Sequence, residues 1–195
     1  MTEFTDIYRT REWFESLNWQ HMWIDAMVGW WIGEFGRPDN MMDFGAGDGW
    51  WSYAFLKMGV SAAALELDAI AKEFIPEGVG VVIQDLRKPF NVGGYYELLL
   101  CLEVGEHIPK EDVEIFCKNI ADHTWRHLLF SAAMPGQPGT GHINLQTPEY
   151  WASKFMQWRL VPNIPVTTKC RDAFRNILPP QYDFLTKNVR VYTKQ

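Results

Sequence analysis

Residues 41–49, which read Met-Met-Asp-Phe-Gly-Ala-Gly-Asp-Gly, constrain the fold more than any other stretch of the chain. Two apolar residues, a carboxylate and three alternating glycines precede residues 50–58, which have a helix-compatible composition. Glycine is needed where a backbone turns sharply or where a ligand approaches it closely. A helix that begins after such a turn presents unpaired N–H groups at the positive end of its dipole. The stretch therefore predicts a strand, a ligand-binding loop and a helix.

Three kinds of nucleotide-binding loop begin with a glycine-rich turn of this sort. A Walker-type phosphate loop needs a Gly-Lys-Ser/Thr ending, and no lysine follows here. A dinucleotide loop reads Gly-x-Gly-x-x-Gly, whereas this chain has Gly-x-Gly-x-Gly. The tighter spacing resembles motif I of the class I S-adenosylmethionine-dependent methyltransferases. By that resemblance, the loop residues expected to bind S-adenosylmethionine are Asp43, Gly45, Ala46, Gly47, Asp48 and Gly49.

In that family an acidic residue at the end of the second strand holds both ribose hydroxyls of the cofactor. A carboxylate suits this role because it accepts two hydrogen bonds side by side. Glu66 ends the apolar run of residues 60–65 and lies 21 residues after Gly45, so the resemblance assigns it this role, with Leu67 beside it. Asp68 is the alternative, although its position also suits the start of the next helix.

Two later apolar runs also end in polar residues. Residues 79–83 lead to Asp85 and Leu86, where the family places a polar residue beside the adenine amino group. The alternative for Asp85 is a helix cap. The run that ends at Leu102 leads to Glu103, and the resemblance implies that these two residues line the methyl side of the cofactor.

Apolar runs that alternate with helix-sized gaps indicate a parallel sheet that binds a ligand at its carboxyl edge. The resemblance implies a Rossmann-like α/β fold, with a seven-stranded, mostly parallel sheet, helices on both faces and strand order 3-2-1-4-5-7-6. A chain of 195 residues is expected to form one domain. The expected strands are residues 40–44, 61–66, 79–83, 96–102 and about 127–132, with two antiparallel strands in residues 154–195 that end at 189–192. The expected helices are residues 50–58, 69–75, 110–122 and 148–157.

The N-terminal segment, residues 1–38, is expected to be helical. Its aromatic residues within 8–35 recur at intervals of three, four and seven, as Trp19, Trp23 and Trp30 do, which indicates an amphipathic helix. Such a helix packs on the sheet, and in the family it also closes over the cofactor.

The formal net charge of -6 hides an asymmetry between the two ends of the chain. Residues 1–153 hold 10 Lys+Arg and 22 Asp+Glu, a balance of -12, and residues 154–195 hold 8 and 2, a balance of +6. One interpretation is an unevenly charged, solvated surface. The other is a basic tail that covers the site and attracts an anionic acceptor.

Residues 103–109, Glu-Val-Gly-Glu-His-Ile-Pro, are the candidates for catalytic or metal-binding residues. They follow the carboxyl end of the expected strand 96–102, where the methyl group of the cofactor should lie. Their Glu-x-x-Glu-His pattern, with a later histidine, resembles the metal site of small-RNA 3′-end 2′-O-methyltransferases and a motif of ubiquinone-pathway O-methyltransferases. The implied ligands of Mg²⁺, Mn²⁺ or Zn²⁺ are Glu103, Glu106, His107 and His142. Without a metal, His107 or His142 would act as general base, and a purely structural role is the third alternative.

The amino-acid sequence of residues 102–109, 130–137 and 141–144 is also similar to that of a bacterial and phage group of methyltransferases. We expect O-methylation of a small hydroxylated or sugar-like acceptor. The alternatives are metal-dependent 2′-O-methylation of RNA and a non-catalytic protein that binds S-adenosylmethionine. The acidic body of the chain disfavours a broad nucleic-acid footprint.

The cysteines and the hydropathy of the sequence indicate the cellular compartment. Three cysteines, Cys101, Cys117 and Cys170, have no metal-like spacing and cannot all pair, which favours reduced thiols. No apolar run approaches the roughly 20 residues of a membrane span, and residues 1–6 lack the basic start of a signal peptide. We therefore expect a cytoplasmic protein without a membrane partner.

Overall fold

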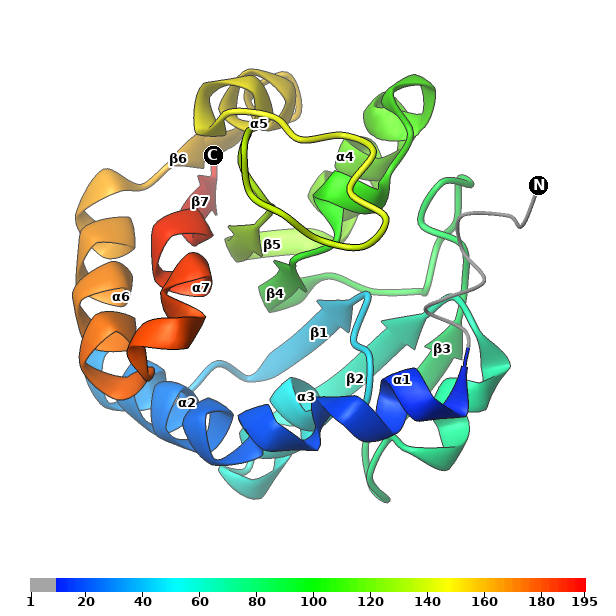
Figure 1. Cartoon of the computed structure of the whole chain (residues 1–195), viewed down its shortest axis with the longest axis vertical. Coiled ribbons are helices and arrows are strands. Elements are labelled where there is room, and N and C mark those ends of the chain that lie inside the picture. The colour runs from blue at the N-terminus through cyan, green and yellow to red at the C-terminus, as the bar shows by residue number, and fades with distance from the viewer. Residues whose placement is uncertain (1–9) are drawn as a thin grey trace.

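The centre of the molecule is one sheet of seven strands, seen in a computed structural model that describes residues 10–195 (Figure 1). The strand order is β3-β2-β1-β4-β5-β7-β6. Pairs among β1 to β5 are parallel, and β7 runs antiparallel to β5 and β6. This sheet confirms the predicted fold and strand order. The strands are β1 Asn40–Phe44, β2 Ser61–Glu66, β3 Gly80–Ile83, β4 Tyr96–Leu102, β5 Thr124–Ser131, β6 Leu160–Pro162 and β7 Arg190–Lys194.

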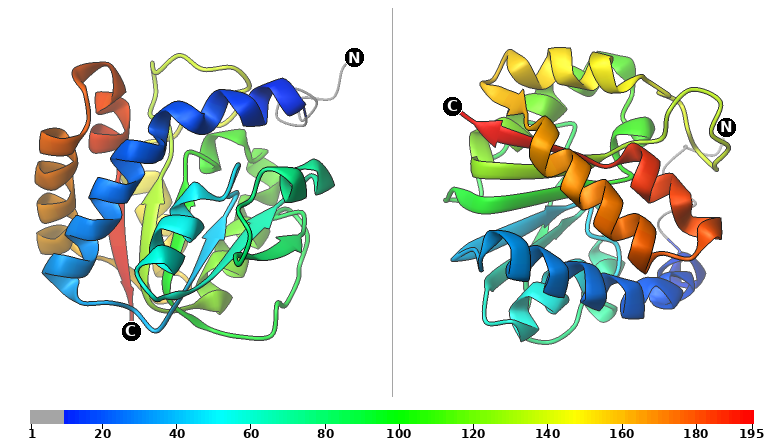
Figure 2. Two further views of the ribbon diagram at one scale, coloured as in Figure 1. Left: turned by 90° about the horizontal axis from the view of Figure 1, so that it is seen from below. Right: turned by 90° about the vertical axis from the view of Figure 1, so that its left-hand side faces the viewer.

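Helices cover both faces of this sheet. On one face lie α2, α3 and α6, and on the other lie α4 and α5 (Figures 1 and 2). The α-helices are α1 Arg11–Glu15, α2 His21–Phe35, α3 Trp50–Lys57, α4 Val113–His123, α5 Pro148–Met156, α6 Ile164–Ile177 and α7 Asp183–Asn188. The 3₁₀ helices are η2 Ser16–Gln20, η3 Ala69–Glu73, η4 Gly105–His107, η5 Lys110–Asp112 and η6 Pro180–Tyr182. Among the described residues, no helix combines the length and apolarity that crossing a membrane requires.

The two faces are built by the alternation of side chains along the central strands. Met42 and Leu99 point into the core under α4 and α5. Their neighbours Met41 and Leu98 point into the core under α2, α3 and α6. Because successive residues of a strand face opposite sides, strands buried on both faces read as unbroken apolar runs. That is why residues 40–44 and 96–102 were recognisable as strands.

The structure corrects three helix predictions. The segment expected as a helix at residues 69–75 is the short 3₁₀ helix η3, capped by the Asp68 side chain, which accepts from Ile70 N at 3.0 Å. The N-terminal helix is interrupted by η2, where Ser16 Oγ donates to Trp13 O at 2.6 Å and competes with the helical pattern. The C-terminal segment holds two helices, α6 and α7, between its two strands, and these were not predicted.

Some of the residues used in the sequence argument fall outside this description. Residues 1–9, including Tyr8, lie outside the described part of the chain, and so does the side chain of Trp19.

Candidate active site

The glycine loop between β1 and α3 has the backbone that the sequence requires. Gly45 and Gly47 have φ angles of 76° and 56°, in the left-handed region that side chains rarely adopt. A Cβ atom on Gly45 would also lie 2.5 Å from Val104 Cγ2. Backbone donors Gly45 N and Ala46 N bond to Leu65 O at 2.8 and 3.1 Å, which ties the loop to the end of β2.

Glu66 closes this loop from the neighbouring strand. Its Oε2 atom accepts from Gly47 N at 2.9 Å, and its Oε1 atom accepts from Leu67 N at 2.6 Å. A carboxylate has about four acceptor positions, so two remain for other donors. Burial raises the pKa of Glu66, and the two backbone donors oppose that rise.

Asp43, at the carboxyl end of β1, is a buried acid whose charge nothing compensates. Its side chain is 2% exposed, and its Oδ2 atom has no hydrogen-bond partner among the described residues. Burial, then the nearby carboxylates of Glu66 and Asp48, raise the pKa of Asp43 to about 8. A hydrogen-bond donor of a bound ligand would satisfy a buried polar atom of this kind.

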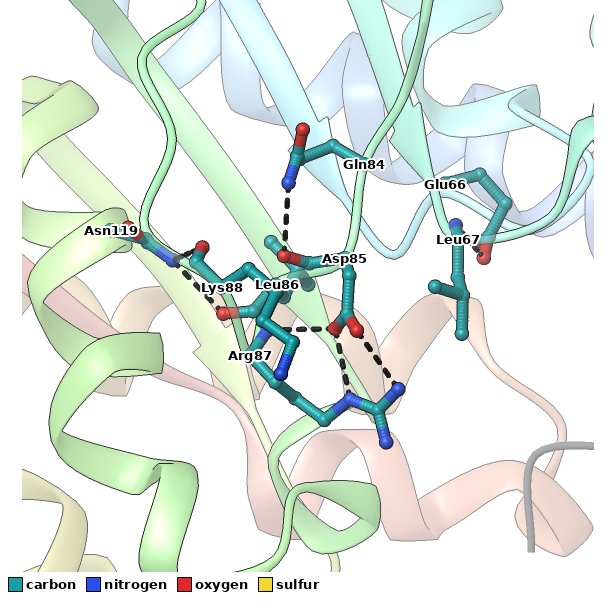
Figure 3. A network of polar contacts seen from close by, with 8 residues as sticks. All are labelled: Glu66, Leu67, Gln84, Asp85, Leu86, Arg87, Lys88 and Asn119. Carbon is teal, nitrogen blue, oxygen red and sulfur yellow. Dashed lines mark hydrogen bonds and ion pairs between the residues drawn. The ribbon is translucent and has the colours of Figure 1, made fainter. Parts of the chain in front are cut away.

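Residues 84–88 follow β3 and form a tight polar turn (Figure 3). Arg87 Nε and Nη2 donate to the two Asp85 carboxylate oxygens, each at 2.9 Å. Burial tends to raise the pKa of Asp85, but the hydrogen bonds from Arg87 outweigh it and the pKa is lowered. Asn119 of α4 stabilises the turn, because its Nδ2 atom donates to the carbonyl oxygens of Leu86 and Lys88 at 2.9 Å each.

The N-terminal helices lie across the glycine loop. His21 Nε2 lies 2.6 Å from Asp48 Oδ2, and the His21 ring stacks on Trp50 with centroids 3.8 Å apart. A Cβ atom on Gly47 would meet Leu17 Cδ1 at 2.9 Å. The N-terminal segment is therefore bonded to the loop and packed against it.

One cavity of about 390 Å³ runs from this loop to the ends of β4 and β5. That volume falls within the range of about 300–1,000 Å³ that is usual for ligand pockets. The predicted residues that line it are Asp43, Gly45, Ala46, Gly47, Asp48, Glu66, Leu67, Asp85, Leu86, Leu102, Glu103, Glu106, His107 and His142. Gly49 does not line the cavity, because it is the residue that caps the start of α3.

Beyond the end of β4, the structure brings three of the four predicted metal ligands together. Ligand atoms of Glu106, His107 and His142 lie within 4.8 Å of one another. His142 Nε2 is 3.9 Å from Glu106 Oε1, and the His107 and His142 ring centroids are 5.2 Å apart. The Glu106 backbone also fixes the position of His142, because Glu106 O accepts hydrogen bonds from the next two residues, Ile143 N and Asn144 N, at 3.0 Å each. The loop that holds His142 crosses the ends of β4 and β5 (Figure 1).

Glu103 lies outside this group of three and faces α7. Its φ angle of 55° turns the chain sharply after β4, and Asn188 Nδ2 donates to its Oε1 and Oε2 atoms at 3.2 and 3.3 Å. Glu103 nevertheless lies close enough to Glu106 for the two carboxyl groups to influence each other's pKa. Burial is the main cause that raises the pKa of both, and the Glu103 charge raises the pKa of Glu106 further.

The donor set of the cluster fits either a metal or a proton acceptor. Two imidazoles and one carboxylate suit Zn²⁺, Mn²⁺ or Fe²⁺. His107 Nδ1 lies 3.0 Å from Gly141 O, so the proton belongs on Nδ1 and the lone pair on Nε2. Burial lowers the pKa of His107 to about 4, and the ring is neutral at pH 7. A metal ligand and a weak base both have this protonation state.

The sequence analysis expected the N-terminal segment to close over the cofactor and offered residues 154–195 as a second cover, but it did not identify the residues that line the cavity. Trp13 and Leu17, before α2, and Tyr182 and Phe184, at the start of α7, line it from the two ends of the chain. No motif marks them, because their positions depend on how α1 and α7 pack. Arg87 was also missed, although its place two residues after Asp85 was a visible signal.

The comparisons with known proteins agree on the fold. No protein-family model and no curated protein sequence matches the chain. The amino pentose methyltransferase CalS10 of Micromonospora echinaspora, solved with S-adenosylmethionine, has a TM-score of 0.67 at 13% identity, covering 93% of this chain and 96% of that one. The magnesium protoporphyrin IX methyltransferase ChlM of Synechocystis, solved with S-adenosylhomocysteine, has a TM-score of 0.61 at 17% identity, covering 90% and 84%. The sugar N-methyltransferase KedS8 of Streptoalloteichus has a TM-score of 0.64 at 12% identity, covering 90% and 87%. The chain thus has the Rossmann-like fold of class I methyltransferases.

Proposed function

We propose that the protein is an S-adenosylmethionine-dependent methyltransferase that methylates a hydroxyl oxygen of a small hydroxylated or sugar-like acceptor. The observation that carries this proposal is the single cavity that joins the glycine loop and Glu66 to the cluster of Glu106, His107 and His142. A cofactor at one end and an acid–base cluster at the other is the arrangement that methyl transfer to oxygen needs.

The cofactor end fits S-adenosylmethionine in shape and in charge. The glycine loop leaves its backbone open to a close approach, and Glu66 retains acceptor positions for ribose hydroxyls. The unpartnered Oδ2 of Asp43 is available to the ammonium group of the methionine moiety. When bound, the cofactor supplies an electrophilic methyl group on a sulfonium. The carboxyl groups that line the cavity complement that positive charge.

The acceptor hydroxyl must lose a proton as its oxygen attacks, and His142 is the base we favour. His107 is the weaker base, because burial lowers its pKa to about 4 and a useful base has a pKa near the working pH. His142 has an Nδ1 atom without a hydrogen-bond partner among the described residues, and its Nε2 atom is 3.9 Å from Glu106. Glu106 can then hold the imidazolium that forms.

A divalent ion is the alternative way to activate the hydroxyl. Mg²⁺, Mn²⁺ or Zn²⁺ held by Glu106, His107 and His142 would lower the pKa of a bound hydroxyl, and the neighbouring Glu103 carboxyl would add negative charge beside the site. This version would also serve 2′-O-methylation of RNA. RNA is disfavoured because the basic residues of 154–195 do not line the cavity.

Calorimetric binding and methyl-transfer assays distinguish the base mechanism, the metal mechanism and a non-catalytic protein. We expect S-adenosylhomocysteine to bind the purified protein and methyl groups to pass from labelled S-adenosylmethionine to hydroxylated acceptors. Full activity in chelator would leave His142 as the base, whereas loss of activity that Mg²⁺, Mn²⁺ or Zn²⁺ restores would establish the metal. Binding without turnover on sugar, phenol and RNA pools would favour a non-catalytic cofactor-binding protein. Absence of S-adenosylhomocysteine binding would overturn the proposal.

A further inference from the structure

A helical hairpin near the C-terminal end of the chain forms part of the cavity wall. This hairpin, residues 163–189, joins β6 to β7 and consists of α6, η6 and α7. Its α6 helix packs beside α2, as both views of Figure 2 show. The hairpin contributes four residues to the cavity, namely Leu178, Tyr182, Phe184 and Leu185.

The hairpin is anchored at the reacting end of the cavity. Asn188, the last residue of α7, donates to both carboxylate oxygens of Glu103. Glu103 in turn interacts electrostatically with Glu106, whose ligand atom lies within 4.8 Å of those of His107 and His142. The side chains that α7 sends into the cavity therefore lie next to the cluster that would activate the acceptor.

The part of the cavity wall that α2 and α3 contribute is also apolar. Trp23, Ile24 and Met27 of α2 and Trp51 of α3 line the same cavity, and they belong to one hydrophobic cluster with Leu178 and Leu185. Phe184 stands at the rim, where its side chain remains 39% exposed. An aromatic ring left partly exposed at the rim of a cavity gains burial when a ligand enters.

The charges that line the cavity exclude an anionic acceptor. Arg87 is the only lysine or arginine among the described residues that line it, and both of its contacts with Asp85 are made after β3, away from the cluster. Lys169 and Lys187 of the hairpin instead pair with Glu34 and Asp183 on the surface. A phosphate or carboxylate next to Glu103 and Glu106 would lie beside carboxyl groups, with no lysine or arginine of the described cavity wall next to it.

We propose that the acceptor is a small, uncharged aromatic alcohol, with a planar apolar body between the hairpin and α2 and one phenolic hydroxyl directed at Glu106 and His142. This inference rests on the proposed function and narrows it, since a sugar would bury several hydroxyls against a wall that offers few partners. In the transfer, the phenolic O–H bond and the S–CH₃ bond of S-adenosylmethionine break, an O–CH₃ bond forms, and the S–CH₃ electron pair stays on sulfur. The proton goes to the base, and S-adenosylhomocysteine leaves as the neutral thioether.

The test is binding to the full chain loaded with S-adenosylhomocysteine. Calorimetric titration with mono- and bicyclic phenols, methyl glucoside and a short single-stranded RNA should show binding of a phenol and no comparable binding of the other two. Phe184→Ala should weaken phenol binding by about tenfold, while Phe184→Leu should keep most of it. Ile164→Ala, an exposed apolar residue of the same hairpin that does not line the cavity, is the matched control and should change nothing.

The outcomes separate this inference from the function on which it rests. Failure of the unmodified chain to bind S-adenosylhomocysteine would overturn both. Binding of S-adenosylhomocysteine together with tighter binding of the glucoside or the RNA, or with no phenol binding, would overturn the aromatic acceptor and leave the methyltransferase standing. An equal loss in Phe184→Ala and Ile164→Ala would remove the hairpin as the specificity element.

Discussion

Asp43 should make the free protein less stable as the pH rises toward 8. Its carboxyl group is 2% exposed, and burial with the neighbouring charges of Glu66 and Asp48 raises its pKa from 3.8 to about 8. In the unfolded chain the same group ionises near its ordinary value. Between those two values the folded state binds one proton more than the unfolded state, so stability must fall with pH. The contribution is fully present below the unfolded pKa and is lost as the pH passes about 8.

The magnitude follows from proton linkage. One extra bound proton gives a slope of about 1.4 kcal/mol per pH unit in the free energy of unfolding. Integrated from about pH 6 to about pH 8, with a folded pKa near 8, this slope lowers the free energy of unfolding by about 2 kcal/mol. For a chain of this size that loss lowers the Tm by roughly 4–8 °C. Asp43→Asn places an amide N–H where the protonated oxygen stands and cannot ionise, so this variant should lose that part of the slope.

Calorimetric or fluorescence-monitored thermal unfolding of the free protein at several pH values is the assay. Glu66, Glu103 and Glu106 also have raised pKa values, and because they remain in the variant, the difference between the two proteins isolates Asp43. Asp85→Asn is the control, since the pKa of Asp85 is lowered and its ionisation is complete over this range. Equal slopes for the unmodified chain and Asp43→Asn would refute the reasoning.

Two further predictions concern the site. Glu66→Gln should weaken S-adenosylhomocysteine binding by about 10- to 100-fold in calorimetry, because charge-assisted hydrogen bonds are each worth about 1.5–3 kcal/mol; an unchanged affinity would remove Glu66 from the ribose. Gly139→Ala should displace the His142 ring, whose Cε1 atom lies 2.1 Å from the position of the added Cβ. It should lower kcat about tenfold or more and leave S-adenosylhomocysteine affinity intact. Gly94→Ala, where a Cβ atom would meet nothing within 4 Å, is the control, and equal kcat values for the two variants would contradict the role of His142.

The fold was predictable because its signals are local. Each central strand is buried on both faces and reads as a short apolar run, and the polar residue after each run marks the carboxyl edge of the sheet. The glycines at 45 and 47 are recognisable because their φ angles are positive, a backbone requirement that the sequence records directly.

The covers of the site were not predictable for the opposite reason. The contact of His21 with Asp48 joins residues 27 positions apart, and that of Asn188 with Glu103 joins residues 85 apart. Neither pair has a spacing rule, since each depends on where a helix comes to rest after packing. The orientation of Glu103 could not be read from its spacing either: Glu103 lines the same cavity as Glu106, His107 and His142, but its backbone has a positive φ angle and its side chain accepts from Asn188 of α7.

The buried carboxyl groups at the two ends of the cavity give the cofactor a second role in the proposed mechanism. Asp43 and Glu66 at one end, and Glu103 and Glu106 at the other, are carboxyl groups whose pKa values are raised chiefly by burial. A ligand with a sulfonium and an ammonium group would favour the ionised form of the first pair, because an opposite charge within a few ångströms lowers a carboxyl pKa. Binding would then release protons and stabilise the folded chain most where the free protein is weakest, above neutral pH. The sulfonium would stand near the second pair, because Glu103 and Glu106 lie at the end of the cavity where the methyl group would be transferred, and the same effect would lower their pKa values.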